Sequence, residues 1–83
     1  MTKYLSLGQH LDSARREGKS EVLLTIEQIE RIIGLPLPMS ARNYRAWWAN
    51  EARGRHVQAR AWTEFGWQVV EVNLASEMVR FSL

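Results

Sequence analysis

The chain has 83 residues, of which 46% are hydrophobic and 24% charged, with four tryptophans and a net charge of +2. This composition is typical of a folded domain rather than a disordered tail, and the length allows one domain over residues 1–83. There are no cysteines, which excludes disulfides, thiolate zinc sites and a cysteine nucleophile. No apolar run approaches the roughly 20 residues of a membrane span, and the N-terminus lacks a signal-peptide core, so we expect a soluble cytoplasmic protein.

The first third of the chain predicts a helix, a short strand and a second helix. Residues 6–17 begin with a serine–glutamine capping box and carry apolar positions at helical spacing. The apolar run 22–24 predicts a strand. Thr25 and Gln28 form a second capping box, followed by isoleucines along one helical stripe and by Gly34 as the stop.

A proline-rich turn then leads into residues 40–50, where the spacing predicts one continuous helix capped by Ser40. Tyr44, Trp47 and Trp48 stand at positions i, i+3 and i+4, which is typical of a packing face. Adjacent helical residues point about 100° apart, so two neighbouring tryptophans both become buried only if the helix is covered on two sides. We therefore expect at least one of the two to be a core anchor.

The C-terminal part predicts a further helix over 56–65 and then a β-hairpin. From residue 68 the hydrophobic period changes to two, with Val70, Val72 and Leu74 on one side and a second alternating run over 78–83. The predicted fold class is α+β, with compact helices and a short three-stranded antiparallel sheet that ends in the hairpin. With one middle helix removed, the element order is that of a winged helix.

Three blocks of the sequence resemble a family of small uncharacterised prokaryotic domains. They read SARNYRAWW at 40–48, HVQARAW at 56–62 and GWQV at 66–69, close to the patterns S-A-R-x-Y-R-A-W-W, H-x-Q-A-x-A-W and G-W-x-V. The intervening EARGR at 51–55 is where the chain departs from the pattern. The likeness covers nearly the whole chain and implies a single compact module. It implies no activity and no site residue, because the family's role is not established.

A basic segment spans residues 42–60, which hold five arginines and one acidic residue, a local charge of +4. Arginine presents a planar fork that suits phosphates. We therefore predict a small nucleic-acid-binding module, with DNA as the favoured partner, in which helix 40–50 reads, residues 53–60 clamp the backbone and the hairpin of Arg80 acts as a wing. The predicted contact residues are Ser40, Arg42, Asn43, Arg45, Arg53, Arg55, His56 and Arg60.

Other functions remain as alternatives or are excluded. A protein-interaction module, such as an adaptor or a phage- or plasmid-borne inhibitor, would use the same Arg/Trp/Tyr cluster as a hot spot, because those residue types dominate such sites. Self-association into a homodimer is also left open. His10 and His56 lack carboxylates at metal-ligand spacing, and no glycine-rich phosphate loop or nucleophile motif is present. We expect no catalysis, no cofactor and no metal.

Overall fold

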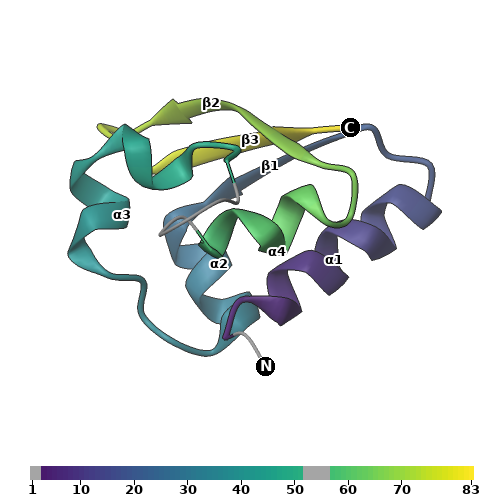
Figure 1. Cartoon of the computed structure of the whole chain (residues 1–83), viewed down its shortest axis with the longest axis horizontal. Coiled ribbons are helices and arrows are strands. Elements are labelled where there is room, and N and C mark those ends of the chain that lie inside the picture. The colour runs from purple at the N-terminus through teal and green to yellow at the C-terminus, as the bar shows by residue number, and fades with distance from the viewer. Residues whose placement is uncertain (1–2, 52–56) are drawn as a thin grey trace.

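The computed structural model describes residues 3–51 and 57–83 of the chain. Within these ranges the chain forms helices packed on one side of a three-stranded sheet (Figure 1). The elements in chain order are α1 (Leu5–Arg16), β1 (Glu21–Thr25), α2 (Ile26–Ile33), α3 (Met39–Asn43), the 3-10 helices η1 (Arg45–Trp48) and η2 (Val57–Ala59), α4 (Arg60–Thr63), β2 (Gln68–Asn73) and β3 (Met78–Ser82). No helix in the described part is long and apolar enough to span a bilayer.

The sheet has the strand order β1-β3-β2, and both pairings are antiparallel. The α+β fold class and the C-terminal hairpin of β2 and β3 are therefore confirmed. The element order is winged-helix-like, with the region between α2 and β2 divided into several short helices. Because β3 is central, both β1 and β2 are edge strands.

Capping explains why α2 begins and ends where predicted. The Thr25 hydroxyl accepts a hydrogen bond from the Gln28 amide, and the Gln28 side chain accepts one from the Thr25 amide. Gly34 closes the helix in the left-handed conformation, with φ of 75°. The capping box predicted for α1 is wrong. Tyr4 holds the N-cap position without a side-chain hydrogen bond, the helix starts at Leu5, and Ser6 lies inside it.

Residues 40–50 do not form one helix. Helix α3 ends at Asn43, Tyr44 is extended with φ of −132° and ψ of 120°, and η1 follows. The indole of Trp48 donates to the Ala41 carbonyl at 2.8 Å, so this oxygen is satisfied by a side chain rather than by the next helical turn. The predicted Ser40 cap is also wrong, since Pro38 holds the N-cap position.

The segment before β2 is likewise divided, into η2 and α4, instead of the continuous helix predicted over 56–65. Residue 56 lies outside the described ranges. The amide of Gln58 donates from its side chain to the Trp47 carbonyl at 2.9 Å, which holds η2 against η1. Trp62 in α4 is buried and points into the core.

A β-bulge between Val69 and Glu71 changes which valines of β2 face the helices. Val69 and Val72 pack against the core, whereas Val70 is 55% exposed. The predicted alternation of Val70, Val72 and Leu74 is therefore wrong on this strand, because the extra residue shifts the register. In β3 the predicted alternation holds for Val79 and Phe81, both of which are fully buried.

Aromatic rings run through the core as one connected series. Tyr4 meets Trp47 edge to face, Trp47 meets Trp48, and Trp48 stacks on Trp62 with ring centroids 5.9 Å apart. Trp48 is buried while Trp47 is half-buried, so the prediction of at least one core anchor is confirmed. Tyr44 was expected on the same packing face, but its side chain is exposed.

Candidate nucleic-acid interface

Arg42 leaves α3 toward the protein interior rather than toward solvent. Its guanidinium donates to the Glu30 carboxylate of α2 at 2.9 Å and to the Glu77 carboxylate of the β2–β3 turn at 2.6 Å. Its side chain is 28% exposed. Arg42 therefore joins three elements, α2, α3 and the hairpin turn, and is a positioning group within the fold.

The electrostatics of this cluster follow from its hydrogen bonds. The Glu77 and Glu30 carboxylates raise the pKa of Arg42. The backbone amide of Leu37, which donates to Glu30 at 2.7 Å, is the main reason that the pKa of Glu30 is lowered, and Arg42 adds to the effect. Arg42 and Glu30 therefore both stay charged at neutral pH. The cluster neutralises most of the charge that Arg42 was predicted to offer a phosphate.

Tyr44 and Arg45 are adjacent in the chain and both exposed, and we call them the Tyr44–Arg45 face. The side chain of Tyr44 is 64% exposed, and Arg45 is also exposed. Within the described ranges, no acidic side chain pairs with Arg45. This face combines an aromatic ring and a guanidinium that the described part of the core does not use.

The other predicted contact residues are distributed unequally. Asn43 is exposed at the end of α3, and Arg60 is exposed at the start of α4. Ser40 is half-buried in a helix of only five residues, which is too short for a strong dipole at its N-terminus. Three further predicted residues lie outside the described ranges: Arg53, Arg55 and His56.

The hairpin does not offer Arg80 as a wing cation. Arg80 lies on the central strand and pairs with Glu71 at 2.9 Å and Glu21 at 3.3 Å. The turn that would form the wing is held to α2, because the Ile26 amide donates to the Glu77 carbonyl at 2.9 Å. The sheet therefore carries an arginine paired with two glutamates, and the hairpin turn does not project as a basic loop.

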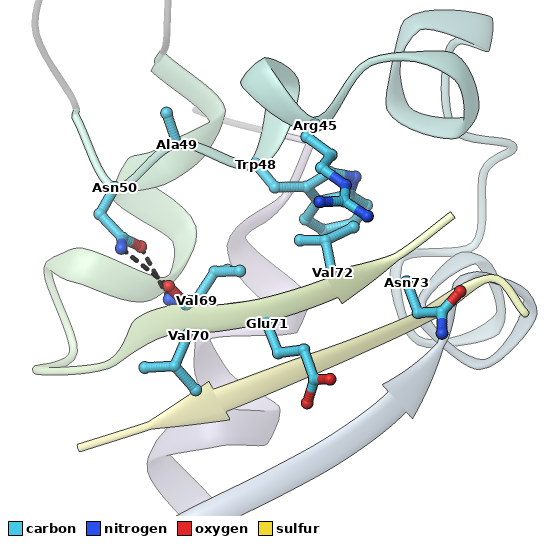
Figure 2. Close-up of a pocket in the computed structure, with 9 residues that line it drawn as sticks. All are labelled: Arg45, Trp48, Ala49, Asn50, Val69, Val70, Glu71, Val72 and Asn73. Atoms are coloured by element: carbon cyan, nitrogen blue, oxygen red, sulfur yellow. Dashed lines mark hydrogen bonds between the residues drawn. The ribbon is translucent and has the colours of Figure 1, made fainter. Parts of the chain in front are cut away.

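An open groove of about 500 Å³ runs along the β2 edge of the sheet, and we call it the β2 groove (Figure 2). One wall comes from η1 and the residues after it, and the other comes from β2. In Figure 2, Arg45 extends from η1 toward β2. The lining residues are Arg45, Trp48, Ala49, Asn50, Val69, Val70, Glu71, Val72 and Asn73.

Asn50 closes one part of this groove. Its side-chain oxygen accepts hydrogen bonds from the Val69 amide at 2.7 Å and from the Trp62 indole at 3.0 Å. Its side-chain amide donates to the Val69 carbonyl at 2.9 Å. Asn50 therefore replaces a paired strand at Val69, a role that the sequence analysis missed. A polar residue two positions after Trp48 was the only local signal for it.

The structure thus defines a class: a small α+β domain, winged-helix-like in element order, with an exposed Tyr44–Arg45 face beside a groove on a sheet edge. The chain belongs to the family described as "Domain of unknown function (DUF7662)", whose family model matches residues 7–83. This membership confirms the prediction of a small uncharacterised domain. No curated protein and no solved structure matches the chain.

Proposed function

We propose that this domain is a nucleic-acid-binding module of the cytoplasm that binds through the Tyr44–Arg45 face without catalysing a reaction. The observation that carries the proposal is that Tyr44 and Arg45, adjacent in the chain, are both exposed. In the described ranges the Arg45 guanidinium has no acidic partner. Removing Arg42 from the predicted contacts leaves four arginines and one acidic residue over 45–60. The net charge of this stretch of sequence still favours a polyanion.

Each residue of the face has a distinct physical role in this proposal. The planar fork of Arg45 can donate two hydrogen bonds to one phosphate. The ring of Tyr44 offers a flat surface on which a base can stack, an interaction of about 1–3 kcal/mol. Arg42 supports both residues indirectly, since it holds α3 to α2 and to the hairpin turn.

Fluorescence anisotropy with labelled oligonucleotides tests the proposal. We expect salt-sensitive binding that Arg45→Ala weakens, with the slope of log K against log salt reduced in magnitude by up to about 1. Arg16→Ala is the matched control, because Arg16 is an exposed arginine on α1, far from α3 in Figure 1. Absence of binding to both duplex and single strands at low salt would refute the proposal.

A protein-interaction module is the second candidate, favoured by exposed apolar side chains that precede Tyr44 in the chain. Met39 is 69% exposed and Leu35 is 45% exposed, close in sequence to Tyr44. Tyrosine and arginine with neighbouring apolar residues are common at protein interfaces. A concentration-dependent dimer in sedimentation, lost on Met39→Asp, together with no binding to nucleic acid, would favour this candidate.

A further inference from the structure

We infer that the nucleic acid bound by this domain is single-stranded, with a base stacked on Tyr44 and the backbone following the β2 groove past Arg45. This inference rests on the proposed function and names its ligand class. Single strands bind where a basic groove follows the backbone and an aromatic side chain offers a platform for a base. Arg45 supplies a cation in the lining of the β2 groove, and Tyr44, the residue before it in the chain, is an exposed ring.

Helix α3 and the β2–β3 hairpin, both within the described residues, do not present the parts with which a winged helix usually reads a duplex. A duplex reader places a helix or a β-ribbon in a major groove about 12 Å wide. Helix α3 has only five residues, about 7.5 Å at the rise of an α-helix, and its arginine, Arg42, turns back to Glu30. The hairpin arginine, Arg80, is held by two glutamates. Neither element presents an unpaired arginine for insertion.

The chemistry of the β2 groove suits a sugar–phosphate chain. Arg45 contributes a cation, and Asn50 and Asn73 contribute neutral amides along the groove. Glu71 is the acidic residue in the lining, and its carboxylate is already bonded to Arg80. The Trp48 ring is only 2% exposed, so it offers no stacking surface. The exposed ring that can stack on a base is therefore that of Tyr44, which precedes Arg45 in the chain.

A peptide strand fits the same groove less well. An added strand needs free backbone amides and carbonyls along the sheet edge. At Val69 both groups are already bonded to the Asn50 side chain. The bulge between Val69 and Glu71 further breaks the regular ladder on β2. These two features protect the edge from strand addition and leave the groove to a ligand that does not pair with the backbone.

The test compares four labelled probes by anisotropy: a deoxythymidine oligomer, a uridine oligomer, and DNA and RNA duplexes, each of about 12 units. We expect the single strands to bind at least tenfold more tightly than the duplexes, and the two oligomers show whether the sugar matters. Tyr44→Ala should lower single-strand affinity about tenfold, whereas Tyr44→Phe, which keeps a stacking ring, should lower it less than threefold. Arg45→Ala should reduce the salt slope by about 0.7.

A variant in the β2 groove tests whether the nucleic acid follows this groove, independently of its contacts with the Tyr44–Arg45 face. Asn73→Asp adds a negative charge at the end of the lining formed by β2 and keeps the acceptor for the Ser76 amide. We expect it to weaken single-strand binding severalfold, while circular dichroism and the melting temperature stay unchanged. Unaltered binding by this variant would overturn the groove path.

Two results distinguish failure of this inference from failure of the proposed function. Equal or tighter binding of the duplexes, with dependence on Arg45, would overturn the single-strand assignment and leave a nucleic-acid-binding module. No binding of any of the four probes would overturn both. Binding of single strands that Tyr44→Ala does not weaken would overturn the stacking role.

Discussion

Replacing Arg42 with methionine tests whether this side chain is a structural clamp. The substitution keeps much of the aliphatic stem and removes the guanidinium that bonds Glu30 and Glu77. Two carboxylates on different elements then lose their shared cation. We expect the domain to lose stability because α2, α3 and the hairpin turn are no longer joined by this group.

The size of the effect follows from the partial burial of the cluster. Hydrogen bonds to charged groups contribute about 1.5–3 kcal/mol when well buried, whereas exposed ion pairs contribute about 0–1 kcal/mol. The side chains here are 28% exposed for Arg42, 21% for Glu30 and 47% for Glu77, so the cluster lies between these limits. We expect a loss of about 2 kcal/mol, or a fall of about 8–16 °C in Tm for a domain of this size.

Thermal and urea unfolding followed by tryptophan fluorescence measure this loss. Arg31→Met is the matched control, because Arg31 makes an exposed i,i+4 pair with Glu27 at 3.2 Å. The control should lose about 0.5 kcal/mol or less. If Arg42→Met were no less stable than Arg31→Met, the structural role of Arg42 would be refuted. Arg42 would then again be a candidate contact residue for the ligand.

Three further predictions concern packing and charge. Asn50→Ala should cost about 2 kcal/mol in urea unfolding, because the buried indole of Trp62 loses its acceptor and the β2 edge loses two bonds. Gly8→Ala should lower stability by about 1–3 kcal/mol in the same assay, since its Cβ would lie 2.5 Å from the carbonyl oxygen of Ala61. Because the pKa of Glu30 is lowered in the folded state, the wild type should be more stable than Glu30→Gln, with the full difference present above the ordinary pKa of 4.5. The difference should shrink as pH falls through the folded pKa of Glu30, measured by thermal melting from neutral to acid pH.

Each of these has a result that contradicts it. Asn43→Ala is the control for Asn50, because Asn43 is an exposed asparagine; equal losses would mean that the Asn50 bonds contribute nothing special. If Gly8→Ala were as stable as Ser6→Ala, a substitution in the same helix, then α1 and α4 could move apart to admit the methyl group without a loss of stability. A difference between wild type and Glu30→Gln that grows toward acid pH would reverse the sign argued for Glu30.

The division of residues 40–50 shows why the candidate site was only partly predictable. Arg42 and Arg45 look alike in sequence, three positions apart in a basic segment. The acids that hold Arg42 lie 12 and 35 residues away along the chain, so no local pattern identifies them. Tyr44 was assigned to a packing face by helical spacing, and the break after Asn43 exposes it. Of the predicted contacts that lie within the described ranges, Arg45, Asn43 and Arg60 are exposed.

Local chemistry by itself determined the α2 helix, the class of the fold and the presence of a tryptophan anchor. The Thr25–Gln28 box and the left-handed Gly34 act over a few neighbouring residues, so the sequence pattern contains their full cause. Only the tertiary structure decided which arginine is a clamp, which valines of β2 face inward and which ring reaches solvent. Those outcomes depend on hydrogen bonds and packing between segments distant in sequence, and such contacts exist only once the helices have docked on the sheet.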